Sequence, residues 1–293
     1  MYLLLPLGRL ARPLNVLLMA LTYVLGTGIA RYLGFPAKLA VFWLGLLGVL
    51  LAQMTIGLLR EVFRPDVRLE NNADAVGVGV GIRDAALYTS IAALAACAII
   101  AFILYKDGVF APPLVLSVGA SLLLVVAYAV PPLRLLDRGF GELLLAINIA
   151  YLGPSIGFLL QAGTYHLLLT TSVLPLTLLL LATYLVLNFP SYAEDLKYKR
   201  ATLLLRLGWE NAVSLHLGLL LAAYVLLGAS ALFGFSLALL APAFLTVPFA
   251  VLQWYLLRNI AMGAKPIWGL LTANAVAVFG LTTYFLTLSF WLR

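Results

Sequence analysis

The sequence has few charged residues, one cysteine and two histidines. Charged residues make up 10% of its 293 positions, whereas hydrophobic residues make up 64%. A water-soluble globule of this length cannot cover its surface with so few charges, so that class is excluded. Cys97 has no second cysteine to pair with, which excludes a disulfide framework and a thiolate metal site.

Long apolar runs fill most of the chain, and its mean hydropathy is +1.10. Nine runs each approach the roughly 20 residues that an α-helix needs to cross the hydrocarbon core of a bilayer. These runs lie near 14–33, 36–59, 85–105, 114–131, 142–162, 167–189, 212–232, 235–257 and 268–291. We therefore predict an all-α integral membrane protein with nine transmembrane helices, in a single domain over residues 1–293.

The 18 Lys and Arg residues divide unequally between alternate gaps in the apolar pattern. Fourteen lie before the first run or in one set of gaps, and four lie in the other set. The positive-inside rule then places the N-terminus in the cytoplasm and, with nine spans, the C-terminus on the opposite side of the membrane. Of the 11 acidic residues only Asp107 falls on the far side, so we expect a polar site at the cytoplasmic face.

The net charge of +7 does not indicate nucleic acid as a partner. No basic block or nucleic-acid motif accompanies the charge, and the Lys and Arg that orient the spans account for the excess. Membrane lipids are the expected surroundings.

The first polar stretch is the end of the second apolar run. Glu61 lies close to the membrane boundary, where an ionisable side chain is costly and more often functional. Arg60 and Arg64 flank it, and the charges continue to residue 74 at one-turn spacing, which is also typical of a solvated surface helix. We expect residues 60–84 to form a cytoplasmic cap loop, with a hinge or lid where glycine and valine alternate.

The second polar stretch joins the fourth and fifth runs. Pro131 and Pro132 end one helix, and glycines loosen the entry to the next. Arg134 and Arg138 in this turn have two interpretations. They anchor the loop at the membrane surface, or they bind an anion there with planar guanidinium donors.

The third polar stretch follows the sixth run, and we expect a second cap loop over about 190–211. Glu194 and Asp195 carry its carboxylates, and they share a membrane face with Glu61 because the second and sixth runs both end in the cytoplasm. Carboxylates from two helices suit Mg²⁺, which is commonly held by one or two carboxylates and substrate phosphates. The natural ligand of such a site is a diphosphate with a lipid tail.

The order of these stretches resembles the UbiA superfamily of intramembrane prenyltransferases, and within it the branch that prenylates 1,4-dihydroxy-2-naphthoate for menaquinone biosynthesis. The resemblance covers nearly the full length. It rests on Arg12-Pro13 followed by Gly26-Thr27-Gly28-Ile29-Ala30, on the stretch from Tyr128 to Glu142, and on Thr202, Leu203, Leu207 and Gly208. It implies nine helices around a central cavity open to the cytoplasmic face, with a lateral apolar cleft for an isoprenoid chain.

The acidic motifs of that family are degenerate in this chain. Gly57 and Arg60 stand where the first motif has Asn, Glu61 stands at its leading Asp, and Arg64 stands at the next Asp. Only Glu61 keeps the charge of the motif.

In the second motif, Ser191 and Asp195 stand at the two Asp positions, with Glu194 as an extra neighbour. The resemblance therefore implies Glu61 and Asp195 as catalytic groups, and Mg²⁺ held by Glu61, Glu194 and Asp195, as one ion rather than two. The implied diphosphate-binding cations are Arg60, Arg64, Arg134, Arg138, Lys199 and Arg200. The other implied pocket residues are Gly57, Tyr128, Asn188 and Ser191.

The function implied is transfer of an isoprenoid chain from a prenyl diphosphate to an aromatic quinone precursor or another lipid acceptor. One alternative is a protein that binds a polyprenyl phosphate, quinone or lipid without transfer, because arginines in place of carboxylates turn a metal site into a direct anion site. A second alternative, a transporter or structural membrane subunit, explains the spans but not the ordered motifs.

Overall fold

The computed structural model describes residues 10–63, 73–198 and 200–293, and of residues 73–80 the backbone alone. Within these residues nine helical segments are long and apolar enough to cross a membrane. The predicted all-α class and the nine spans are therefore confirmed.

The first four spans are α2 (Pro13–Tyr32), α3 (Leu39–Val62), α4 (Ala73–Lys106) and α5 (Pro112–Ala129). The fifth combines α6 (Gly141–Ala146), the π-helical turn η2 (Ile147–Leu152) and α7 (Gly153–Ala162), and the sixth combines α8 (Leu167–Asn188), η3 (Phe189–Ser191) and α9 (Tyr192–Lys197). The last three are α11 (Trp209–Ala229) with η4 (Ser230–Phe233), then α12 (Leu237–Leu240), η5 (Ala241–Thr246) and α13 (Val247–Ala261), then α14 (Trp268–Leu292). Two short helices, η1 (Leu135–Arg138) and α10 (Leu203–Leu207), lie between spans.

Proline sets several of these boundaries. Pro13 and Pro112 occupy the first turn of α2 and α5, where an N–H group has no partner within the helix in any case. Pro131 and Pro132 follow α5 and prevent it from continuing. The sequence-based boundaries consequently fall within a few residues of the observed ones.

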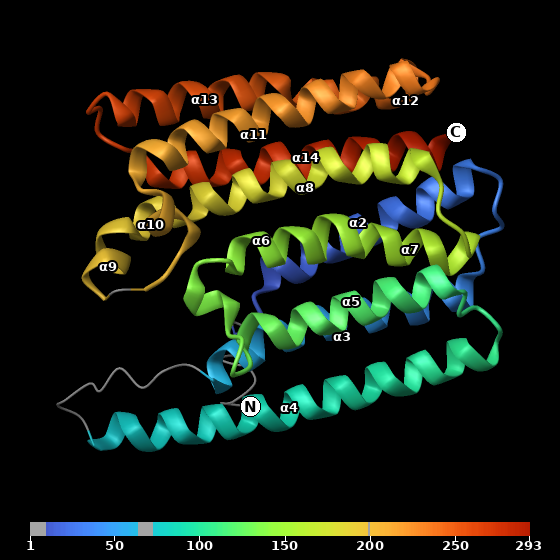
Figure 1. Cartoon of the computed structure of the whole chain (residues 1–293), viewed down its shortest axis with the longest axis horizontal. Helices are drawn as coiled ribbons and strands as arrows, with labels where there is room; N and C mark the ends of the chain where they lie inside the picture. Colours follow the sequence, from blue (N-terminus) through green and yellow to red (C-terminus); the bar gives the residue numbers. More distant parts are fainter. Residues whose placement is uncertain (1–9, 64–72, 199) are drawn as a thin grey trace.

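The spans lie side by side and alternate in direction, so that the charged segments gather at one end of the bundle, on the left in Figure 1. There α3, α5, α9 and α13 end, α2, α4, α6, α11 and α14 begin, and η1 and α10 lie between them. We call this the polar end, comprising residues 10–15, 57–63, 81–84, 128–142, 184–198, 200–211 and 258–268. The C-terminus lies at the opposite end, as an odd number of spans requires.

Helices α2 and α7 approach each other closely in the centre of the bundle because two glycines face the opposing backbone. A Cβ atom on Gly26 would lie 1.9 Å from the carbonyl oxygen of Pro154, and one on Gly157 would lie 2.4 Å from that of Tyr23. Thr27 spans the same interface by donating a hydrogen bond to the Gly157 carbonyl at 3.3 Å. Small residues with a hydroxyl bridge are a common way of joining helices in a membrane, where apolar burial supplies little driving force.

The expected cap loops differ from the structure in one respect. Residues 73–84 are helical and form the start of α4, so the sequence-based prediction of a loop over these positions is wrong. The predicted hinge or lid at the alternating glycines stays a prediction. Alternation of glycine and valine weakens a helix without forbidding it. The charged residues 64–72 lie outside the described residues. The expected cap at 190–211 contains α9 and α10.

Candidate functional site

The start of α2 lies against α3 and α5 at the polar end. Arg12 donates a hydrogen bond through Nη1 to the buried hydroxyl of Tyr128 at 3.2 Å. Gly57, which the sequence placed near the pocket, packs against the backbone just before Arg12, where a Cβ atom would lie 2.4 Å from the Leu10 carbonyl oxygen. The segment before α2 therefore contacts the end of α3 through its backbone and the end of α5 through the Arg12 guanidinium.

Glu142, in the first turn of α6, is a buried carboxylate of this end. Its Oε1 accepts a hydrogen bond from Asn188 Nδ2 at 2.5 Å and one from the backbone N–H of Leu203 at 3.3 Å. These two donors come from the end of α8 and the start of α10. Glu142 therefore ties three segments together, and burial makes such hydrogen bonds to a charged group costly to lose.

Arg12 offsets only part of the cost of burying the Glu142 carboxylate. The guanidinium interacts electrostatically with Glu142 and also with the hydroxyls of Tyr128 and Tyr184. Tyr184 in turn donates a hydrogen bond to Asn15 Oδ1 at 3.1 Å. Three hydrogen-bonded pairs thus lie at this end, Arg12 with Tyr128, Asn15 with Tyr184 and Glu142 with Asn188, and we call these six buried or half-buried residues the Arg12 cluster.

Asp195 lies beside this cluster in α9 and is 5% exposed. Its Oδ2 accepts a hydrogen bond from Ser191 Oγ at 2.8 Å, and its Oδ1 is paired with Arg200 Nη1 at 3.5 Å. Glu194, the adjacent residue, is exposed because successive positions of a helix point in different directions. The structure thus brings Asp195, Ser191 and Arg200 together and leaves Glu194 outside that group.

Both arginines of the turn between α5 and α6 interact with other residues of the same turn. Arg134 forms an ion pair with Asp137, and Arg138 donates a hydrogen bond to the Pro132 carbonyl at 3.2 Å. Arg138 is exposed and Arg134 is half-buried, so both guanidinium groups keep donors that face solvent. Anchoring the loop and offering donors to an anion are therefore compatible.

The carboxylates that the sequence assigned to metal do not form one group. Among the described residues, which include Glu61, Glu194 and Asp195, no set of three or more His, Cys, Asp and Glu side chains is close enough to hold a metal ion. Glu61 and Arg60 are half-buried at the end of α3. Arg64 and Lys199 lie outside the described residues, so their predicted roles remain predictions.

The donor set at Asp195 fits one Mg²⁺ ion only with help from a ligand. One buried carboxylate with a neighbouring hydroxyl supplies too few oxygens for octahedral coordination, and phosphate oxygens commonly complete such sites. The guanidinium groups of the polar end suit the same phosphate, because planar N–H donors pair with its oxygens. The arrangement is thus suited to a phosphorylated head group at the membrane surface.

Sequence reasoning missed Glu142, Arg12, Asn15 and Tyr184 as members of the site. Arg12 and Glu142 carried a signal, since both belong to the stretches on which the family resemblance rests. Asn15 and Tyr184 carried none, because a single polar side chain in an apolar run has no partner visible in the sequence.

No protein-family model matches the chain, and no curated protein matches it. Solved structures do match over nearly the full length. The structure of a UbiA homolog from Archaeoglobus fulgidus bound to DMAPP and Mg²⁺ matches with a TM-score of 0.67 and 18% identity, and the match covers 94% of this chain and 98% of that one. The same homolog bound to GPP and Mg²⁺ matches with a TM-score of 0.66 and 19% identity, over 95% and 98% of the two chains. The chain therefore has a UbiA-like fold.

Proposed function

We propose that this protein is a membrane prenyltransferase, which moves an isoprenoid chain from a prenyl diphosphate to an acceptor dissolved in the membrane. The observation that carries the proposal is the full-length likeness of fold to a UbiA homolog bound to GPP and Mg²⁺. This likeness agrees with the composition of the polar end, which holds a buried carboxylate and several guanidinium groups.

The diphosphate binds at the polar end, with its chain directed into the membrane. Arg134, Arg138 and Arg200 have side chains that reach solvent there, and Arg60 is half-buried at the end of α3. A diphosphate carries several negative charges that only cations can offset, and arginine forks match its oxygens in pairs. The predicted contributions of Arg64 and Lys199 belong to the same proposal.

Mg²⁺ is held by Asp195 together with diphosphate oxygens, and Glu61 is the second carboxylate that we assign to it. When bound, the ion neutralises charge on the departing pyrophosphate. Asp195 suits this role because it is buried and oriented by Ser191. We propose one ion rather than two, since Glu194 is exposed and stands apart from Asp195.

The reaction requires little covalent chemistry from the protein. The bond between the allylic carbon and the bridging oxygen breaks, the electron pair leaves with pyrophosphate, and the allylic carbon becomes cationic. An electron pair of the acceptor ring forms the new carbon–carbon bond, and the ring then loses a proton. The arginines stabilise the departing charge, and the apolar helices below keep water from the cation.

The acceptor that we propose is an aromatic quinone precursor of the dihydroxynaphthoate type. The proposal rests on the resemblance of residues 128–142 to the menaquinone branch of the family. The Arg12 cluster lies at the same end of the bundle as the proposed diphosphate site, and Tyr128 and Asn188 are the members that we assign to hydrogen bonds with the ring.

A second function is favoured by the scattered carboxylates. Because Glu61, Glu194 and Asp195 do not form one group, the polar end also suits direct binding of a polyprenyl phosphate by arginine without transfer. The two functions make opposite predictions for a chelator. Binding by arginine alone is insensitive to EDTA, whereas prenyl transfer assisted by Mg²⁺ is abolished by it.

The test uses the purified protein in lipid nanodiscs with labelled geranylgeranyl diphosphate, and measures binding and pyrophosphate release separately. Release that requires both Mg²⁺ and 1,4-dihydroxy-2-naphthoate supports the transferase. Tight binding in EDTA without release supports the second function, and absence of binding contradicts both. Asp195→Asn abolishes release, whereas the matched control Asp107→Asn, an exposed carboxylate at the opposite end, leaves it unchanged.

A further inference from the structure

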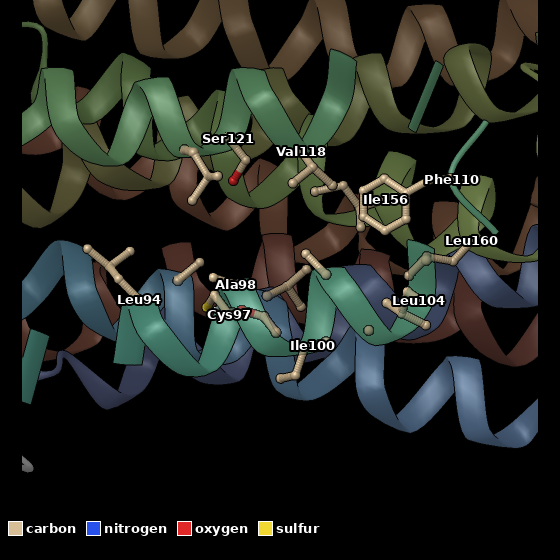
Figure 2. Close-up of a pocket in the computed structure, with 16 residues that line it drawn as sticks. Leu94, Cys97, Ala98, Ile100, Leu104, Phe110, Val118, Ser121, Ile156 and Leu160 are labelled. Atoms are coloured by element: carbon tan, nitrogen blue, oxygen red, sulfur yellow. Dashed lines mark hydrogen bonds between the residues drawn. The ribbon is translucent and has the colours of Figure 1, made fainter. Parts of the chain in front are cut away.

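An apolar pocket opens between α3, α4, α5 and α7 in the half of the bundle away from the polar end. Figure 2 shows Phe110 of the α4–α5 loop and Leu160 of α7 at one side of the pocket, and Ser121 and Leu94 toward the other side. Its volume is about 310 Å³. A buried apolar cavity of about 150 Å³ holds one benzene molecule, so this pocket has room for about twice that, on the order of ten to twelve carbon atoms.

Small side chains create the hollow. Gly45, Gly48 and Ala52 face it from α3, and Ala98 and Ala101 face it from α4. A Cβ atom added to Gly48 would meet only the Cγ2 methyl group of Ile100, at 3.6 Å, so the backbone there is not crowded. Helix α4 packs along α3 and stands apart from α5, which leaves the pocket in reach of the bilayer.

The few polar side chains near the pocket satisfy one another. Ser121, which lines it, donates a hydrogen bond to Asn148 Oδ1 at 2.7 Å, and Asn148 Nδ2 donates one to Gln53 Oε1 at 3.0 Å. Cys97 donates a weak hydrogen bond to the Gly48 carbonyl at 3.4 Å. The pocket therefore offers an occupant no unsatisfied polar group, and a hydrocarbon chain suits it better than a ring with hydroxyl or carbonyl substituents.

The distance from the polar end sets which part of a chain reaches the pocket. Glu61 lies nine residues beyond Ala52 in α3, and Tyr128 lies seven residues beyond Ser121 in α5, which correspond to about 13 Å and about 10 Å at 1.5 Å per residue. The pocket itself extends from Ala52 to Gly45, about 10 Å by the same measure. A bicyclic acceptor held there would be roughly 10 Å from the reacting carbon, so it is not the occupant.

An isoprene unit adds four bonds to a chain. Three bonds of an extended chain span about 3.5 Å, so one unit spans about 5 Å. A two-unit chain with its diphosphate at the polar end therefore ends at the inner edge of the pocket, and a four-unit chain fills about 10 Å beyond that edge.

We infer that this pocket receives the third and fourth isoprene units of the substrate, and that it makes the protein selective for prenyl diphosphates of four units over those of two. The inference rests on the proposed function. Phe110, Leu104 and Leu160 close the outer end and limit the length that the pocket accepts. Gly48 and Ala101 are the specificity-determining positions, because a larger side chain at either one fills the space.

The test measures kcat/KM and direct binding for geranyl and geranylgeranyl diphosphate in Ala101→Phe and Gly48→Leu, in nanodiscs. We expect both variants to lose at least tenfold in kcat/KM for the four-unit chain and to stay within twofold for the two-unit chain. The unchanged two-unit reaction also shows that the variants fold. The matched control is Ala95→Phe, an exposed position of the same helix that does not line the pocket, and it leaves both values unchanged.

Three outcomes overturn the inference. Equal losses for both chain lengths mean that the substitutions act on the fold, and unchanged selectivity means that bilayer acyl chains alone occupy the pocket. In either case the proposed transfer reaction still stands. If the parent protein binds neither diphosphate, the proposed function fails and the assignment of the pocket fails with it.

Discussion

Asn188 donates its side-chain amide to Glu142 across 2.5 Å, although the two residues are 46 positions apart in the chain. The bond joins the end of α8 to the start of α6, and the Leu203 N–H adds the start of α10 to the same carboxylate. One buried side chain therefore joins the start of α6 to the end of α8 and the start of α10, the two segments that flank Asp195 and Arg200 in the candidate site.

Replacing Glu142 with alanine should destabilise the protein by about 1–3 kcal/mol, because Asn188 and the Leu203 N–H both lose their acceptor. Glu142→Gln keeps an acceptor oxygen of similar shape and should lose less. Thermal unfolding in one detergent measures the difference. Asp107→Ala, which removes an exposed carboxylate, serves as the control, and a loss in Glu142→Ala no larger than in this control would contradict the role of Glu142.

Tyr128→Phe should lower stability by about 1.5 kcal/mol, since it removes the acceptor of a hydrogen bond from a charged donor. The value lies at the low end for such bonds because Arg12 is only half-buried and can turn to water. Urea or thermal unfolding gives the measurement. Tyr255→Phe, at a 55% exposed position of α13, should change nothing, and equal effects of the two substitutions would show that the Arg12 contact contributes no stability.

The nine spans could be predicted from the sequence because each apolar run is a local signal. The unequal distribution of Lys and Arg between alternate gaps in the apolar pattern likewise predicted that Glu61, Arg134 and Asp195 lie at one end of the bundle, as observed. The helical start of α4 was missed, because the glycines between residues 75 and 81 suggested a loop while the backbone continues the helix.

The contacts that form the site could not be predicted. Glu142 with Asn188, and Arg12 with Tyr128, are pairs far apart in sequence whose meeting depends on how the helices pack. The pocket is harder still to foresee, because it arises from the absence of side chains on two helices that happen to face each other. Sequence reasoning also grouped Glu194 with Asp195, whereas their helical positions separate them.

Gly26→Ala should disrupt the packing of α2 on α7 severely, since the added methyl group would overlap the Pro154 carbonyl oxygen. Overpacking of a tight interface typically costs 1–3 kcal/mol or more. Gly119→Ala in α5 is the matched control, because a Cβ atom there meets nothing within 4 Å. It should stabilise the helix by about 0.5–1 kcal/mol. Unfolding temperatures of the two variants should therefore move in opposite directions, and a shift of both in the same direction would contradict the interface.

Asn148→Leu tests how much the buried hydrogen bonds near the pocket stabilise the bundle. It removes the contacts of Asn148 with Ser121 and Gln53, which join three helices. Hydrogen bonds between membrane helices contribute about 0.6 kcal/mol on average, so we expect a loss of roughly 1 kcal/mol, well below that of Gly26→Ala. A loss as large as that of Gly26→Ala would mean that the polar contacts, and not close backbone packing, dominate the stability of the bundle.

Arg200→Gln should change two properties in opposite directions. Arg200 pairs with Asp195 at 3.5 Å, and half of its side chain is exposed. In the proposed reaction Asp195 holds Mg²⁺ and Arg200 binds the diphosphate, so the two interactions compete with the ion pair. Without Arg200, the half-saturating Mg²⁺ concentration should fall about two- to fivefold, as expected for a partly exposed pair worth at most about 1 kcal/mol. The KM for prenyl diphosphate should rise over the same range or more, because a phosphate contact is lost.

Lys265→Gln removes an exposed cation from the polar end outside this group and should alter neither value. A parallel rise of both values would mean that Arg200 supports the structure of the site and does not contact the diphosphate.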